Sequence, residues 1–393
     1  MLGGSVLGGS VLGVRVLYVI NGLGTGGTER SLAELLPALR DGGVEPVIAC
    51  LFHRHEGVHE ALAARGFDVR VLPGPGWATR ARALRRLVRA TGPDLVHTAI
   101  FESDVLGRWA ARRTSVPVLT SLVNTSYGPA RRADPHVRAW RLQAVRAVDG
   151  WTARHLTTHF HAVTEAVKEA AVDALHVRAD RVTVIERGRD PERLGRTTPE
   201  RRARVRATLG LGDDDEVVLN VGRQEYQKAQ RDLLDAFAFV AARRARAVLL
   251  IAGREGNASP ELARQHARSP AADRIRFLGH RDDVPDLLAA ADVFAFPSLY
   301  EGTGGAAIEA MAMGLPIVTS DIDAMSEVVE EGRNALLVPP HAPRPLAEAI
   351  AALLDDPARR LAFGASSRAI FEARFTLARS ARAMVELYGR VSG

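Results

Sequence analysis

Two glutamates, Glu301 and Glu309, are separated by seven residues in a glycine-rich segment, LYEGTGGAAIEAMAMGLPIVTS. Glu301 lies in the loop after an apolar, strand-like run, and a helix is expected to begin near Gly305. Because a helix N-terminus is partly positive, the amides of Gly304, Gly305 and Ala306 suit a phosphate. The two carboxylates can accept hydrogen bonds from hydroxyls on either side of it. The segment therefore predicts a site for a phosphorylated ligand with a sugar at one end and a ribose at the other.

Two cations occupy a second segment, NVGRQEYQKAQRDLLDAF. Arg223 follows Gly222 directly after a strand-like run, and Lys228 lies five residues later, at the expected start of a helix. An arginine fork and a compact lysine charge at the end of a strand suit a pyrophosphate. The chain has 52 basic residues, of which only two are lysines, so a lysine here favours a need for a point charge. The alternative is a solvated residue at the start of a helix.

A glycine loop, NGLGTGGTER, lies between the first expected strand and the first expected helix. Gly22, Gly24 and Gly27 match the pattern G-x-G-x-x-G, in which glycines allow close approach to a phosphate. A nicotinamide dinucleotide site would also need Asp or Glu at the end of the second strand, where the chain has ACLFH instead. Two interpretations remain: a loop that faces a phosphate or an acceptor, and a structural turn.

Metal ligands have two weak candidate sets. Asp321 and Asp323 form a D-x-D string, which holds a divalent metal in some enzymes, but here it follows an expected strand of another kind of fold. His155, His159 and His161 are close in sequence, yet no carboxylate or cysteine has a matching ligand spacing. We therefore expect no metal and no cofactor.

The composition is that of a soluble globular chain, with 47% hydrophobic and 25% charged residues over 393 positions. It excludes a disordered, collagenous or disulfide-stapled protein, and no apolar run is long enough to span a bilayer. The opening, MLGGSVLGGSVLG, is expected to be a disordered leader rather than a signal peptide. The single cysteine, Cys50, lies in an apolar run, which indicates a buried hydrophobe and a reducing cytoplasm.

The net charge of +6 arises in the first half, because residues 1–190 hold 25 Lys+Arg against 18 Asp+Glu. Aromatic residues make up only 5% of the chain and arginine dominates its composition, so we expect no nucleic-acid partner. Residues 77–90 predict a basic helix, with Trp77 at its start. Such a helix is either a peripheral contact with anionic lipid at the inner membrane face or an ordinary covering helix.

Apolar strands alternate with helices in two series, separated by a charged, proline-containing linker at residues 187–215. This pattern predicts an α/β protein with two doubly wound, Rossmann-like parallel sheets whose carboxyl ends face a central cleft. We expect one domain at 1–190, a second domain at 191–375, and a last helix at 376–393. The helix at 345–375 is expected to cover the second sheet, and the last helix, at 377–391, either does the same or crosses back to the first domain.

Several segments resemble one family. GGTER, GRQEYQK, FHAVTEAVKEAAV and EGTGGAAIEAMAMGLPIVTSDIDAMSEVVEEGRNALLVPP are similar to retaining, metal-independent nucleotide-sugar glycosyltransferases of the GT-B fold, the large family 4-like group. VTVIERGRDPERL resembles the family's interdomain linker, VIPNGVDPERF. The resemblance spans nearly the whole chain, and the two glutamates with their EAMAxGxPIV continuation are its most specific part.

The resemblance implies that residues 1–190 form the acceptor domain and residues 191–375 the nucleotide-sugar donor domain, and it implies a role for each matching position. Arg223 and Lys228 would bind the donor diphosphate and stabilise the leaving group, the amides at 304–306 would hold the same phosphates, and Glu301 would contact the donor sugar. Glu309 would bind the ribose. His280 and Arg281 would lie next to the base of the nucleotide, and Gly26 and Gly27 would border the reacting centre from the other domain.

The chain departs from the family on the acceptor side. Val123 replaces a common histidine, so that role is missing or moves to Asn124. His97 is retained, but the second histidine of the family's HxH pattern is Ala99. We therefore expect a glycosyltransferase that uses a UDP- or GDP-sugar on a glycan, lipid-linked or small-molecule acceptor. The alternatives are a sugar-nucleotide epimerase of the same fold and a non-catalytic nucleotide-sugar binding protein.

Overall fold

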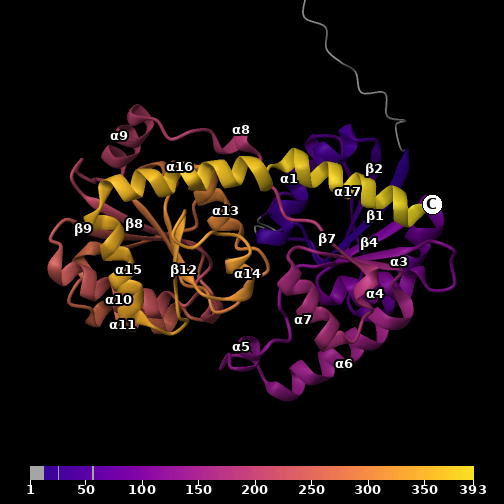
Figure 1. The fold of residues 1–393 in the computed structure, drawn as a ribbon. Coiled ribbons are helices and arrows are strands. Elements are labelled where there is room, and N and C mark those ends of the chain that lie inside the picture. Colours follow the sequence, from indigo (N-terminus) through magenta and orange to yellow (C-terminus); the bar gives the residue numbers. More distant parts are fainter. Residues whose placement is uncertain (1–12, 25, 55–56) are drawn as a thin grey trace, which may run out of the picture.

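The computed structural model describes residues 13–24, 26–54 and 57–393. The predicted leader lies outside these residues, apart from Gly13. The chain forms two parallel sheets, each covered by helices on both faces (Figure 1). Their near-continuous apolar strands explain this arrangement, because a strand buried on both faces needs a helix layer on each side.

The first sheet has seven strands in the order β3-β2-β1-β4-β5-β6-β7. Its strands are β1 (Val14–Ile20), β2 (Val44–Cys50), β3 (Asp68–Val71), β4 (Leu95–Ala99), β5 (Val118–Leu122), β6 (His159–Ala162) and β7 (Val182–Val184). Its helices are α1 (Gly27–Asp41), α2 (His59–Ala64), α3 (Trp77–Thr91), α4 (Phe101–Ala111), α5 (Pro129–Arg132), α6 (Ala139–Leu156) and α7 (Glu165–Leu175).

The second sheet has six strands in the order β10-β9-β8-β11-β12-β13. Its strands are β8 (Glu216–Val221), β9 (Ala247–Ala252), β10 (Ile275–Gly279), β11 (Val293–Phe296), β12 (Ile317–Ser320) and β13 (Ala335–Val338). Its helices are α10 (Gln230–Arg243), α11 (Ser259–Arg268), α12 (Val284–Ala290), α13 (Gly305–Ala312), α14 (Asp323–Ser326), α15 (Pro343–Asp355) and α16 (Pro357–Arg374).

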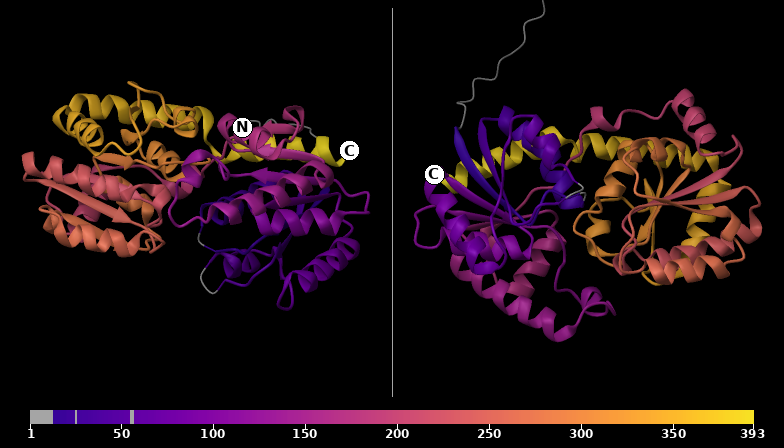
Figure 2. Two further views of the ribbon diagram at one scale, coloured as in Figure 1. Left: turned by 90° about the horizontal axis from the view of Figure 1, so that it is seen from below. Right: turned by 180° about the vertical axis from the view of Figure 1, so that it is seen from behind.

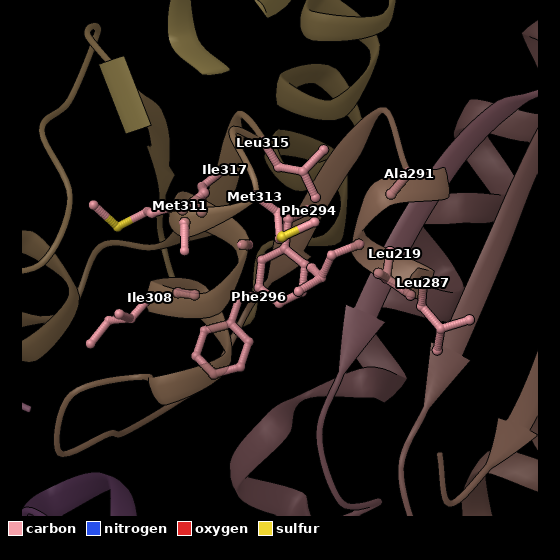
Figure 3. Packing of buried hydrophobic residues seen from close by; sticks show 14 of the residues in the cluster. Leu219, Leu287, Ala291, Phe294, Phe296, Ile308, Met311, Met313, Leu315 and Ile317 are labelled. Carbon is pink, nitrogen blue, oxygen red and sulfur yellow. The ribbon is translucent and has the colours of Figure 1, made fainter. Parts of the chain in front are cut away.

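The core of the second domain fixes the helix that carries the glutamate pair. Phe294 and Phe296 of β11 are buried, with ring centroids 5.8 Å apart, and pack in one cluster with Ile308 and Met311 of α13 (Figure 3). Truncating a buried phenylalanine to alanine typically costs about 3–5 kcal/mol. The core therefore holds the N-terminus of α13 rigidly at the carboxyl edge of the sheet.

The C-terminal helices differ from the expectation at one point and agree with it at another. The helix expected over 345–375 is broken at Asp356, whose side chain accepts from the amide of Arg359 at 2.9 Å, and Pro357 opens α16. Proline suits this first helical position because it has no amide to donate. The last helix, α17 (Leu377–Ser392), crosses back and packs on α1, β1 and β4 of the first domain (Figure 2), which agrees with the expectation of a crossing helix and excludes the alternative, a cover for the second sheet.

The linker is more ordered than its charge suggests. It contains α8 (Pro191–Leu194) and α9 (Pro199–Thr208). Instead of lying exposed, as its charge would suggest, α9 packs on α12, and Arg206 is buried. That guanidinium donates to the carbonyl of Ala290 at 3.1 Å and to the carboxylate of Asp292 at 2.8 Å.

Candidate functional site

The carboxyl edges of both sheets line one cleft of about 1020 Å³. Twelve of the thirteen residues singled out from the sequence line it: Gly26, Gly27 and Asn124 from the first domain, and Arg223, Lys228, His280, Arg281, Glu301, Gly304, Gly305, Ala306 and Glu309 from the second. Segments far apart in the chain therefore meet here, since Gly26 and Glu309, 283 positions apart, border the same space.

Lys228 and Glu301 form an ion pair inside the cleft. Lys228 lies in a 3₁₀ turn, Tyr226–Lys228, one turn before α10 rather than at its start. Its Nζ also lies 4.9 Å from the centroid of the Phe296 ring, a cation–π contact. Glu301 is only 7% exposed, so the pair is partly desolvated and its geometry is tightly held. The lysine charge is thus aimed into the cleft by a carboxylate on one side and a ring on the other.

Arg223, the second cation, is positioned by a close approach between the backbones that follow β8 and β9. A Cβ on Gly253 would lie 1.9 Å from the carbonyl oxygen of Gly222, so only glycine lets these two strand ends come together. Arg223 follows that contact, with a side chain that is 54% exposed and 3.2 Å from Glu225. Because it is exposed and weakly paired, Arg223 is free to turn its guanidinium toward a ligand in the cleft.

The N-terminus of α13 faces the cleft between the two glutamates. Gly304 has a φ of +63°, and a Cβ there would lie 2.7 Å from the sulfur of Met325, so this position requires glycine. The amides of Ala307 and Ile308 both donate to the Gly304 carbonyl. The preceding amides of Gly305 and Ala306 lie outside this helical pattern and are the donors that an anion at a helix start uses.

Glu309 is held by the linker, which sequence reasoning missed. Arg189 donates from Nε to Glu309 Oε1 at 2.9 Å and from Nη1 to Ser31 Oγ of α1 at 3.2 Å. Arg193 lies 3.6 Å from the same carboxylate oxygen. Arg189 is 5% exposed, so it is a buried cation that connects the two domains beside the predicted ribose site. The only clue in the sequence was that arginine replaces the apolar residue of the family's linker.

The domains also touch at the base of the cleft. A Cβ on Gly302 would lie 2.0 Å from the carbonyl oxygen of Val123, and Thr164 donates to the Gly302 carbonyl at 3.0 Å. On the opposite side, Arg30 of α1 lies 3.4 Å from Asp282, next to His280 and Arg281. These contacts bring the glycine loop and the donor residues to opposite walls of the same space.

The structure does not bring His97 to the cleft. It is buried against Tyr388 of α17, with Nδ1 2.8 Å from that hydroxyl, and Nε2 lies 2.7 Å from Ser121 Oγ. Burial, followed by the neighbouring His161, lowers the pKa of His97 to about 3. Both ring nitrogens of His97 thus have partners within the protein, and the side chain lines a smaller pocket beside the cleft rather than the cleft itself. Of the two acceptor-side candidates, only Asn124 faces the cleft.

Residues 13–24, 26–54 and 57–393 contain no cluster of three or more His, Cys, Asp or Glu side chains arranged to hold a metal ion. His159 bonds to Thr183 and His161 to the carbonyl of Ile185, which accounts for two of the three histidines considered as ligands. Burial raises the pKa of Cys50 to about 12, so it is a thiol at neutral pH. Within the same residues, every helix is too short or too polar to cross a membrane.

Two family models match successive parts of the chain. A model of "Glycosyltransferase Family 4" matches residues 25–193, and a model of "Glycosyl transferases group 1" matches residues 215–356. D-inositol 3-phosphate glycosyltransferase 2 of Catenulispora acidiphila is 31% identical over 76% of this chain and 70% of its own. Alpha-D-kanosaminyltransferase of Streptomyces kanamyceticus is 27% identical over 61% of this chain and 68% of its own.

The fold has close structural neighbours. HepE of Anabaena in complex with UDP-glucose superposes with a TM-score of 0.84 at 24% identity, over 96% of this chain and all of HepE. Sucrose-phosphate synthase of Thermosynechococcus elongatus gives 0.80 at 21% identity, over 96% and 98%. The chain is thus a two-domain α/β protein of the GT-B type. It belongs to the family 4-like GT-B glycosyltransferases.

Proposed function

We propose that the protein transfers a sugar from a nucleotide diphosphate to an acceptor hydroxyl with retention of anomeric configuration and without a metal ion. One observation carries the proposal. Lys228, Arg223 and the first amides of α13 line one cleft, which Gly26 and Gly27 of the other domain also border. A diphosphate leaving group in that region is neutralised by protein charge alone.

Each end of the donor has a matching carboxylate. Glu301 keeps one oxygen on Lys228, which leaves its other oxygen to accept from the sugar hydroxyls beside the reacting carbon. Glu309, held by Arg189, can accept from the ribose hydroxyls. Because Glu301 is tied to a cation, it is a weak nucleophile. We therefore favour front-face attack, in which the acceptor oxygen bonds to the anomeric carbon while the leaving phosphate takes the acceptor's proton.

The donor is expected to be a UDP- or GDP-sugar, and the acceptor a glycan, a lipid-linked compound or a small molecule. UDP is the first nucleotide to test, since a structural neighbour is bound to UDP-glucose. The single, buried cysteine favours a cytoplasmic reaction.

A thermal-shift screen against UDP-, GDP-, ADP- and dTDP-sugars identifies the donor, because binding to the folded state raises its stability. The matched donor is then used with candidate acceptors, and NMR of the product gives its anomeric configuration. An inverted product overturns retention. Donor turnover that needs no acceptor indicates an epimerase, and the absence of any stabilising sugar nucleotide indicates that the site is not a donor site.

A further inference from the structure

All four tryptophans of the chain are on one helical layer and are unusually exposed. Trp77 of α3, Trp109 of α4, and Trp140 and Trp151 of α6 are 46%, 42%, 66% and 45% exposed. A ring of this size buries much apolar area when it is packed, so a folded protein normally covers most of it. In this chain none of the four serves chiefly as a core residue.

The three helices lie side by side on one face of the first sheet. α4 packs between α3 and α6, and the layer is on the opposite side of the sheet from α1 and α17 (Figure 1). We call its outer surface the tryptophan–arginine face and define it by the exposed side chains of α3, α4 and α6. The rings of Trp109 and Trp151 stack across two of these helices, with centroids 6.3 Å apart, and Arg112 lies 4.7 Å over the Trp109 ring.

The first half of α6 has few partners. Its buried residues, Asp149, Gly150, Thr152 and Ala153, all lie in the second half of the helix. Residues 139–148 project from the layer with Trp140 and Val148 exposed, the latter by 47%. A helix whose apolar side chains are left open over this length is prepared to meet another surface.

The charge on this layer has one sign. Residues 77–156 contain 14 arginines and no lysine, against five acids, and three of those acids are buried. The arginines that are exposed include Arg82, Arg86, Arg89, Arg112, Arg113, Arg138, Arg141 and Arg154. The outward potential is therefore strongly positive around the four indole rings.

We propose that the tryptophan–arginine face docks on a membrane surface that contains anionic lipid. Indole rings settle at the level of lipid headgroups, where their apolar body and N–H are both satisfied, and arginines beside them bind lipid phosphates. A protein partner is less well matched, because the core of a protein interface is depleted of charge, whereas arginine surrounds these rings. The basic helix predicted at 77–90 is one part of a face that spans three helices.

This position is close to the acceptor side of the cleft. α6 begins shortly after α5, whose Arg131 donates to the hydroxyl of Tyr300 at 2.8 Å, next to Glu301. A membrane that touches the start of α6 would lie near the entrance from which an acceptor reaches the donor sugar. The docking proposal does not depend on glycosyl transfer, and it is tested by binding alone.

Intrinsic fluorescence reports this docking directly, because every tryptophan of the chain is on the face. Vesicles of phosphatidylcholine mixed equally with phosphatidylglycerol should shift the emission to the blue, and brominated acyl chains should quench it. Vesicles of phosphatidylcholine alone should do neither at the same lipid concentration. Equal binding to the two kinds of vesicle, or binding to neither, would overturn the proposal.

Charge reversal then tests the location. The variant Arg112→Glu/Arg141→Glu should lose at least about 25-fold in vesicle affinity, since each lost cation is worth about fivefold at an anionic surface. The matched control, Arg264→Glu/Arg344→Glu, changes the net charge equally on α11 and α15 of the second domain and should bind as the parent does. Both variants should keep the parent's melting temperature. An equal loss of vesicle affinity in the two variants would indicate attraction by net charge alone and would overturn the assignment of docking to the tryptophan–arginine face.

Light scattering of the lipid-free protein tests whether the face binds a second copy of the chain instead of a membrane. If the parent dimerises and the Arg112→Glu/Arg141→Glu variant is monomeric, the face is an interface between copies and the proposal is wrong. A variant with Trp140→Ser and Trp151→Ser should lose quenching while keeping donor binding. If it does not fold, the charge-reversed pair still decides the question.

Discussion

Acid should destabilise the protein through two buried histidines, and the direction of their hydrogen bonds explains why. The carbonyl of Ile185 can only accept, so His161 donates to it from Nε2 at 3.0 Å and keeps Nδ1 as an acceptor. Ser121 must then donate to that Nδ1 at 2.8 Å and accept from His97 Nε2 at 2.7 Å. Each imidazole is thereby fixed as the neutral Nε2–H tautomer.

The same series of hydrogen bonds extends to the last helix. His97 Nδ1 accepts from the hydroxyl of Tyr388 in α17, and Tyr388 accepts from Tyr18 in β1. A proton added to either imidazole would place two donors face to face. This series of hydrogen bonds therefore connects α17, across the first sheet, to the start of the interdomain linker only while both histidines are neutral.

The size of the effect follows from the pKa values. Burial lowers the pKa of His97 to about 3 and that of His161 to about 4, whereas an unfolded histidine titrates near 6.5. The unfolded state therefore takes up protons first, and stability falls as the pH drops below about 6.5. Between about pH 7.5 and pH 5 the loss is roughly 2 kcal/mol for each histidine.

Asp104 opposes this trend. Its burial raises the pKa of the carboxyl to about 7, so the folded state takes up that proton first and gains stability as the pH falls through that value. The raw pH profile of the parent therefore mixes opposite signs. The comparison of the parent with His97→Gln removes the contribution of Asp104, because that carboxyl is present in both proteins.

Urea unfolding of the parent and of His97→Gln at about pH 7.5 and pH 5 measures the difference. The glutamine amide can accept from Tyr388 and donate to Ser121 without titrating. The parent should lose roughly 2 kcal/mol more than the variant over this range. His136→Gln, at an exposed histidine, is the control and should follow the parent. Identical pH profiles for the parent and His97→Gln would refute the claim that His97 is buried and neutral in the folded protein.

Three further outcomes are expected. In steady-state kinetics, Lys228→Ala should lower kcat by roughly 10²–10³-fold, because it removes a preorganised charge that stabilises the leaving group. Glu309→Ala should instead raise the donor KM by roughly 10–150-fold, because the ribose hydroxyls do not change during transfer. EDTA should leave turnover unchanged, and a loss restored by Mn²⁺ or Mg²⁺ would contradict metal independence. Gly302→Ala should lower stability by about 1–3 kcal/mol in thermal unfolding, since its Cβ would meet the carbonyl oxygen of Val123 at 2.0 Å; an unchanged melting temperature would show that this contact is absent in solution.

Much of the architecture and of the donor wall could be predicted because both depend on local patterns. Strands buried on both faces appear as short apolar runs, and glycine-rich loops at their carboxyl ends must meet at one edge of a parallel sheet. That rule alone is enough to bring Arg223, Lys228 and Glu301 together. The pairing of Lys228 with Glu301, separated by 73 positions, is a consequence of the strand order and is not visible in either segment by itself.

His97 shows why the acceptor side was harder. Its apolar neighbours in β4 and its place near a strand end suit an active-site residue as well as a core residue. The side chain is withdrawn from the cleft by Tyr388, which lies 291 positions later on a helix that could have packed on either domain. Long-range packing of this kind leaves no periodic trace near the histidine.

Arg189 is the linker residue that connects the donor site with the contact between the domains. A linker rich in charge and proline is normally solvated, and composition gives no reason to treat one of its arginines differently. Yet Arg189 is buried, and two of its hydrogen bonds join Ser31 of the first domain to Glu309 of the second. The carboxylate proposed to bind the ribose is therefore oriented by a side chain that also joins the two domains. Arg189 thus contributes both to the geometry of the donor site and to the contact between the domains, which explains why a linker residue belongs to the site.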